Sequence, residues 1–216
     1  MTRRSVPGKM RTLHFHLLGV SGSLRRNSAC TAVLRTAAEQ LPPGVTMTMA
    51  PLGRLPLYND DEDRAEALQA VEAFRTAIEA ADGLVVISPE YNHGMSGVLK
   101  NAVDWVSRPG YESVLRNKPV LVMSASNSPL GGVRAQQQLR ETFASTLSRV
   151  VARRQVVIGQ APKKVVDGRL VDDATLAFIA DAVDDLLDEI SLVRRTPDVD
   201  LRGSLMRLTR PTALQD

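Results

Sequence analysis

Three serines, two adjacent arginines and two glycines occur in the short stretch GVSGSLRRNS, residues 19–28. Hydroxyl groups and guanidinium groups donate hydrogen bonds, and glycine lets the backbone approach a ligand closely. Ser23, Ser28 and Arg25 could therefore hold an anion, with Gly22 admitting it. A single phosphate suits them best, because no Walker A or dinucleotide glycine pattern follows. The alternative is a polar turn that is only capped and solvated.

Two more polar stretches follow apolar runs further along the chain. SPEYNHGMSGVLKNAVDW covers residues 88–105, and SASNSPLGG covers residues 124–132. Backbone N–H and C=O groups in the first could bind the polar edge of a flat ring, with Gly94 and Gly97 leaving space for it. Three such loops together indicate a nucleotide-like ligand that has a phosphate and a planar heterocycle.

The alternation of apolar runs and helical patterns predicts how these loops are brought together. We expect strands at 13–20, 45–52, 83–91, 118–126 and 153–159, and helices at 28–40, 64–81, 96–107, 133–148 and 172–193. Such alternation is typical of an α/β fold, here a flavodoxin-like three-layer sandwich with a five-stranded parallel sheet in the order 2-1-3-4-5. In that order, the three polar loops lie together at the carboxyl ends of the strands.

The stretches GSLRRNS, PEYNHGMSGVLKNAVDW and SAS…GG resemble the NADPH-dependent FMN reductase family, the flavodoxin-like group that contains quinone, chromate and azo-dye reductases. The resemblance covers about residues 13–190. It implies FMN as cofactor and NADPH, or NADH, as electron donor. The FMN contacts that it implies are Ser23, Arg25, Asn27 and Ser28 at the phosphate, Pro89, Glu90, Tyr91 and Asn92 along the isoalloxazine ring, and Ser124 or Ser126 from the third loop.

The reaction that the resemblance implies is a ping-pong exchange. NAD(P)H gives a hydride to FMN N5 and leaves, and a small acceptor (quinone, flavin, azo dye or chromate) then takes the electrons. The flavin supplies the chemistry, so we expect no catalytic side chain, and N–H groups of the loop 124–132 would stabilise the reduced ring. The alternatives are a flavodoxin-type electron carrier and a flavin-based sensor, neither with NAD(P)H turnover of its own.

Several other residues could do chemistry but have simpler explanations. His93 could gate the site, donate to a substrate or be an ordinary loop residue. Arg134 could meet a pyridine-nucleotide phosphate or an acid of a partner. Cys30 is expected to be a small packing residue and Trp105 a core or interface residue. The acidic run at 60–63 fits a solvated helix start, so we predict no metal site.

Composition limits the class of partner. The 216 residues are 44% hydrophobic and include one cysteine, as in a globular protein of a reducing compartment, and we expect a cytoplasmic location. Residues 1–12 have a net charge of +4 and residues 191–216 of +2, which leaves the body at −3. Because the basic residues lie in the ends, nucleic acid is a poor candidate partner. No apolar run reaches the length needed to span a membrane.

These observations divide the chain into three parts. We expect a basic N-terminal extension at 1–11, an FMN-binding domain at 12–193 and a C-terminal tail or arm at 194–216. The family resemblance implies a homodimer or a pair of dimers, a homotetramer, with the helices at 96–107 and 133–148 as candidate interface elements. Loops 53–63 and 107–117, together with the neighbouring subunit, are expected to determine which acceptor is used.

Overall fold

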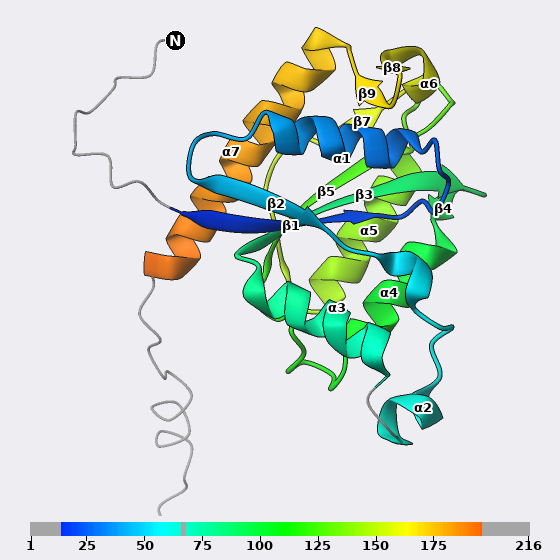
Figure 1. The fold of residues 1–216 in the computed structure, drawn as a ribbon, viewed down its shortest axis with the longest axis vertical. Helices are drawn as coiled ribbons and strands as arrows, with labels where there is room; N and C mark the ends of the chain where they lie inside the picture. Colours follow the sequence, from blue (N-terminus) through cyan, green and yellow to red (C-terminus); the bar gives the residue numbers. More distant parts are fainter. Residues whose placement is uncertain (1–13, 66–67, 196–216) are drawn as a thin grey trace, which may run out of the picture.

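A mostly parallel sheet runs through the centre of the protein, and helices cover both of its faces (Figure 1). The computed structural model describes residues 14–65 and 68–195. The strands of this sheet are β1 (Phe15–Ser21), β2 (Val45–Met49), β3 (Gly83–Tyr91), β4 (Gly94–Met95), β5 (Pro119–Ala125), β6 (Arg149–Val150) and β7 (Val156–Ile158). Their order is β2-β1-β3-β5-β6, with β7 paired to β5 and β4 paired antiparallel to β3. The predicted flavodoxin-like sandwich is confirmed.

The helices form two layers, one on each face of the sheet. They are α1 (Ala29–Glu39), α2 (Asp60–Ala65), α3 (Gln69–Ala80), α4 (Gly97–Val106), α5 (Val133–Ser145), α6 (Ala161–Lys164) and α7 (Asp173–Arg195), with the 3₁₀ helix η1 (Leu52–Arg54). Helices α1 and α7 pack on one face, and α3, α4 and α5 pack on the other. A small hairpin, β8 (Val165–Val166) and β9 (Arg169–Leu170), contacts α1.

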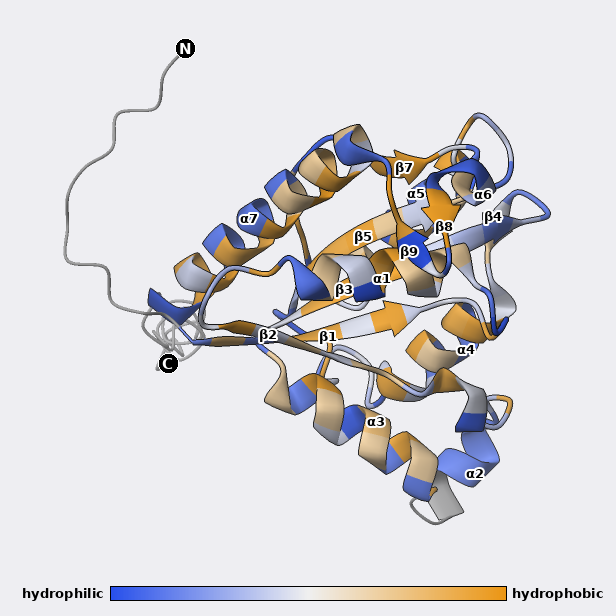
Figure 2. Cartoon of the chain, turned by 45° about the horizontal axis from the view of Figure 1, so that its top comes forward, coloured by the Kyte–Doolittle hydropathy of each residue, from blue (hydrophilic) through white to orange (hydrophobic). Residues whose placement is uncertain are grey.

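The central strands are buried on both faces, which explains their continuous apolar sequences. Neighbouring residues of β1 belong to different cores: Leu17 packs toward α1 and α7, and Leu18 packs toward α3 and α4. Figure 2 shows the same pattern as apolar colour along β1, β3 and β5. Parallel strands covered by helices on both sides need apolar residues at every position, not at every second one.

Three predicted elements differ in their limits. The helix expected at 64–81 is two helices, since α2 begins at Asp60 with acidic side chains in its first turn, where the helix dipole favours them. The strand expected at 153–159 is shortened to β7 and preceded by β6. Helix α7 continues through Arg194, which forms an ion pair with Asp82 and donates a hydrogen bond to the carbonyl of His14.

The described residues include only part of the predicted end segments. The extension at 1–11 and all of the tail beyond Arg195 lie outside the described residues. Within residues 14–65 and 68–195, no helix combines the length and the apolar character that a membrane crossing needs.

The strands β1, β3 and β5 end at one edge of the sheet, on the right of Figure 1. Ser21 of β1 is in register with Ile87 of β3, and Ser88 of β3 is in register with Ser124 of β5. The loops that follow these strands therefore meet at this carboxyl edge, as the strand order predicts.

Candidate functional site

A cavity of about 210 Å³ lies at this carboxyl edge, between the three loops. Seven of the ten predicted contacts line it: Ser23, Arg25, Ser28, Pro89, Glu90, Tyr91 and Ser126. Asn27, Asn92 and Ser124 do not belong to its lining. The other lining residues are Ala29, Cys30, Ala125, Asn127 and Ala161.

The turn at 22–28 and the start of α1 form one end of the cavity. Ser28 is the N-cap of α1, and its hydroxyl accepts a hydrogen bond from Thr31 N at 3.3 Å. The N–H groups of Ala29 and Cys30, in the first turn, have no acceptor within the helix. Arg25 folds over the turn and donates to the carbonyl of Asn27 at 3.3 Å. This end therefore offers N–H, hydroxyl and guanidinium donors beside the positive end of a helix dipole, an arrangement suited to an anion.

Gly22 has a role in the packing of the protein itself. A Cβ at this position would lie 2.7 Å from Ser96 Oγ and 3.3 Å from the carbonyl oxygen of Ile87. Ser96 is the N-cap of α4. Glycine is therefore needed so that the turn can approach the start of α4, and its role in admitting a ligand stays a prediction. Gly94 likewise faces a protein side chain, that of Gln138, whereas Gly97 faces open space.

A short hairpin of β3 and β4 forms a second wall. Asn92 and His93 occupy its turn with φ angles of 49° and 66°, the left-handed values that a tight two-residue hairpin requires. Asn92 thus serves the turn, outside the cavity lining. Tyr91, which precedes the turn, lines the cavity and is 51% exposed.

The carboxylate of Glu90 is bonded to a helix on another part of the chain. Its Oε2 accepts hydrogen bonds from the backbone N–H groups of Arg134, at 2.9 Å, and Ala135, at 3.0 Å, in the first turn of α5. Its Oε1 lies 3.8 Å from Nδ1 of His93. No local sequence pattern indicates this contact, because it joins residues 44 and 45 positions apart.

Buried serines at the strand ends hold the loops in place. Ser88 Oγ accepts from Ser96 N at 3.0 Å and donates to the carbonyl of Pro89, and Ser124 Oγ donates to the carbonyl of Gly131 at 2.9 Å. Ser124 is fully buried beneath its loop, so the geometry favours Ser126 as the candidate ligand contact. Sequence reasoning missed the role of Ser88, although a single serine ending an apolar run is a readable signal.

Asn101 and Trp105, in the second half of the 88–105 motif, hold the loop at 56–58, which lies outside the cavity lining. Asn101 Oδ1 accepts from Tyr58 N at 2.7 Å, and Asn101 Nδ2 donates to the carbonyl of Pro56 at 2.7 Å. Trp105 Nε1 donates to the same carbonyl at 2.8 Å. The Trp105 side chain is completely buried, as expected for a core residue. Leu57, between the two held residues, is 84% exposed.

Cys30 lines the cavity but is not a nucleophile. Its side chain is buried, and burial raises the pKa of the thiol to about 12. A thiol with such a pKa stays protonated near neutral pH, and the protonated form is unreactive. The expectation of a packing residue fits this environment.

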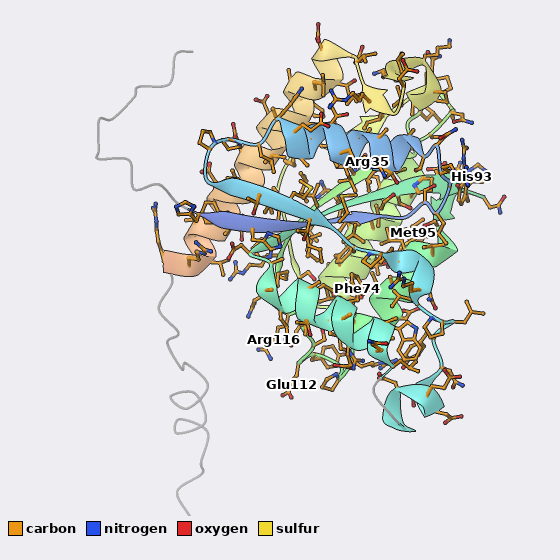
Figure 3. All side chains as sticks on the ribbon, viewed as in Figure 1. Arg35, Phe74, His93, Met95, Glu112 and Arg116 are labelled. Carbon is orange, nitrogen blue, oxygen red and sulfur yellow. The ribbon has the colours of Figure 1, made fainter. Side chains whose placement is uncertain are left out.

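Loop 107–117 lies far from the cavity. It connects the end of α4 to the start of β5, at the amino edge of the sheet, and Lys118 beside it donates to the carbonyl of Ala81 at 2.6 Å. Figure 3 shows Glu112 and Arg116 at the lower left and His93 at the right. Within one subunit this loop does not line the cavity, and its role beside the cavity of a neighbouring subunit stays a prediction.

The residues of the cavity fit FMN. The donors at the turn suit a phosphate, because a doubly charged oxyanion can use the helix N–H groups and Arg25 together. The walls at 89–91 and 125–127 contribute small and polar residues and one aromatic residue, which suit a flat heterocycle with a polar edge.

Comparisons with known proteins agree with this fit. A family model described as NADPH-dependent FMN reductase matches residues 15–163. An NAD(P)H-dependent FMN reductase of Pseudomonas aeruginosa is 41% identical over 164 residues, 76% of this chain and 88% of that protein. A quinone reductase of Escherichia coli (strain K12) is 36% identical over 159 residues, 72% of this chain and 84% of that protein.

Among solved structures, the flavoenzyme NAD(P)H:(acceptor) oxidoreductase FerB of Paracoccus denitrificans matches with a TM-score of 0.72 at 30% identity. The match covers 82% of this chain and 97% of that one. Since the family model spans well over half of the chain, including all three loops at the cavity, the chain belongs to the NADPH-dependent FMN reductase family and is an oxidoreductase that uses FMN with NAD(P)H as electron donor.

Proposed function

We propose that this protein passes electrons from NAD(P)H to a small acceptor of the quinone class through FMN held in the carboxyl-edge cavity. The observation that supports this most strongly is the cavity itself, which joins the donors at the turn and the start of α1 to a wall of small and polar residues with one aromatic residue. The acceptor class is supported by relatives: besides the quinone reductase above, a 2-hydroxy-1,4-benzoquinone reductase of Burkholderia sp. is 40% identical over 125 residues, 58% of this chain and 68% of that protein.

The turn at 22–28 would hold the FMN phosphate. Ser23 and Ser28 offer hydroxyl groups, and Arg25 offers a charged donor at the cavity lining. Asn27 would act indirectly, because its carbonyl accepts the hydrogen bond that keeps Arg25 over the turn. The side chain of Asn27 is exposed.

The hairpin and the third loop would line the flavin ring. Pro89, Glu90, Tyr91 and Ser126 face the cavity, and Asn92 shapes the hairpin turn. Bound FMN supplies the redox chemistry, taking a hydride from the donor and giving electrons to the acceptor, so we assign no catalytic side chain. Donor and acceptor would use the same open side in turn, which is a ping-pong scheme.

We also propose a homodimer or a pair of dimers. Leu57 supports this, since α4 holds it through its neighbours while it projects into solvent. An apolar side chain that is both exposed and fixed is well suited to a subunit contact.

The visible spectrum of the FMN-loaded protein tests the proposed function. Anaerobic NADPH, or NADH, should bleach the flavin band, and a benzoquinone should restore it. Initial rates at several fixed quinone concentrations should give parallel double-reciprocal lines. Intersecting lines would exclude the ping-pong scheme. A band that stays oxidised with both donors would favour the electron carrier or the sensor.

A further inference from the structure

The β3–β4 hairpin is joined to α5 at two points that lie opposite each other. Glu90 and Met95 are paired across the two strands. Glu90 reaches α5 through its carboxylate, which accepts from Arg134 N and Ala135 N. Met95 reaches α5 through its backbone N–H, which donates to Oε1 of Gln138 at 2.7 Å. Both strands of the hairpin are therefore fastened to one helix.

The local geometry at each end explains why the two links form. Helix α5 begins after Gly132, which has a φ of 87° and no side chain to cap the helix, so Glu90 supplies the cap from a different element. At Gly94 a Cβ would lie 2.8 Å from Gln138 Oε1. Glycine at this position therefore leaves the space through which Gln138 reaches Met95.

The anchored residues differ sharply in burial from the tip of the hairpin. Only 17% of the Glu90 side chain is exposed, and Met95 is buried, whereas 72% of the His93 side chain is exposed. Figure 3 shows His93 and Met95 on the same side of the molecule, with His93 further out. Tyr91 lies between the anchors and the turn, and it lines the cavity. The two links to α5 thus determine where Tyr91 stands relative to the cavity.

We propose that Glu90 and Gln138 are positioning residues, which hold the hairpin tip over the cavity and thereby determine how tightly FMN is bound and how easily an acceptor enters. Neither residue takes part in the chemistry. The inference rests on the proposed placement of FMN in this cavity. Both oxygens of Glu90 have neighbours of the protein itself, two backbone N–H groups and His93, as expected for a structural link.

A direct role of the Glu90 charge is the competing explanation, and Glu90→Gln separates the two. An amide keeps an oxygen that can accept from Arg134 N and Ala135 N, but it has no charge and cannot transfer a proton. Glu90→Ala removes the link altogether. Gln138→Ala removes only the second link, at an exposed residue.

Asp172→Ala is the matched control for the loss of a helix cap. Asp172 Oδ1 accepts from Thr175 N at 3.0 Å at the start of α7, and neither residue belongs to the cavity lining. This variant loses a carboxylate cap at a helix start without touching the β3–β4 hairpin.

We would measure FMN dissociation constants by fluorescence quenching, the visible circular dichroism of bound FMN, and KM and kcat with benzoquinone. Glu90→Ala should weaken FMN binding about tenfold, because a hairpin that is no longer held must be ordered when FMN binds. It should also change the dichroism and raise the acceptor KM more than it lowers kcat. Gln138→Ala should weaken FMN binding about threefold. Glu90→Gln should lose much less FMN affinity than Glu90→Ala, and Asp172→Ala should bind FMN as the unmodified protein does.

Three results would overturn the inference. The first is an unchanged FMN constant and dichroism in Glu90→Ala, or in Gln138→Ala if Glu90→Ala does not fold. The second is a loss in Glu90→Gln as large as in Glu90→Ala, which would show that the charge matters. The third is an equal loss in Asp172→Ala. If the unmodified protein did not bind FMN, both the proposed function and the inference would fail. If the unmodified protein bound FMN and the variants bound it equally well, only the inference would fail.

Discussion

The turn at 22–28 and the hairpin at 89–95 both border the cavity, but they are built in opposite ways. The turn offers hydrogen-bond donors to a ligand, because the first N–H groups of α1 have no acceptor within the helix and Arg25 is exposed. In the hairpin, polar groups already have partners: the Glu90 carboxylate accepts from two backbone N–H groups of α5, and Met95 N donates to the Gln138 side chain.

This difference separates two tasks of a cofactor site. Donors without partners can contribute binding free energy when an anion arrives. A wall that is fixed beforehand loses little conformational freedom on binding and keeps a planar ligand in one orientation. We therefore expect ligand binding to change the turn much more than the hairpin and the third loop.

The largest effect, on stability, is expected where the third loop, on the preformed side of the cavity, packs against Gly159. A Cβ on Gly159 would lie 2.2 Å from the carbonyl oxygen of Pro129, and backbone atoms cannot move aside easily. Gly159→Ala should lower the free energy of unfolding by about 3 kcal/mol, measured by urea denaturation. Gly110→Ala is the control, since nothing lies within 4 Å of its Cβ position. Equal stability of the two variants would contradict the tight packing of this loop.

The next largest effect is expected on FMN affinity, at the turn at 22–28, whose donors would bind the phosphate. Arg25→Ala should weaken FMN binding roughly 10- to 100-fold, because a hydrogen bond to a charged group is lost. Arg26→Ala is the control, since Arg26 is also exposed but does not line the cavity. Riboflavin, which has no phosphate, should bind equally to all three proteins. A comparable loss of riboflavin affinity in Arg25→Ala would show that Arg25 does not bind the phosphate.

The thiol beneath the turn should make stability depend on pH. The pKa of Cys30 is raised from 9.0 to about 12 by burial, so above pH 9 the unfolded chain loses a proton that the folded protein keeps. Stability should then fall by about 1.4 kcal/mol per pH unit on this account. Cys30→Ala should remove that part of the slope in urea unfolding from about pH 8 to about pH 10. Identical slopes would contradict a buried thiol.

The smallest effect is expected at the hairpin turn. His93 has a φ of 66°, a conformation that glycine adopts more easily. His93→Gly should therefore raise the free energy of unfolding by about 0.5 kcal/mol and leave FMN affinity unchanged. Thermal unfolding and steady-state kinetics check this. A large fall in kcat would show instead that His93 acts on a substrate, one of the roles that the sequence analysis leaves open.

The fold could be predicted largely from the sequence because its signals are local and repeated. Apolar runs such as 83–91 mark strands that are buried on both faces, and the helical segments between them imply a parallel sheet and a shared carboxyl edge. The division of 64–81 into α2 and α3 was missed, because the charged residues from Asp60 onward already form a helix.

The site was predictable only in part. The loops around the cavity were found because serine, glycine and arginine cluster after apolar runs. The contacts of Glu90 with α5 and the packing of Gly22 against Ser96 join segments far apart in the chain, and no local pattern indicates them. The family resemblance implies Ser124 or Ser126, which lie near the end of β5 and just beyond it, and only burial separates them.

Hydrogen exchange of the FMN-free and FMN-loaded protein, measured peptide by peptide, tests the contrast between the two walls most directly. We predict that the peptide covering 22–31 exchanges rapidly without FMN and becomes strongly protected with it. The peptide covering 88–96 should be protected in both forms. A hairpin that exchanges freely until FMN binds, or a turn whose exchange FMN does not change, would contradict the division into a preformed wall and a ligand-completed one.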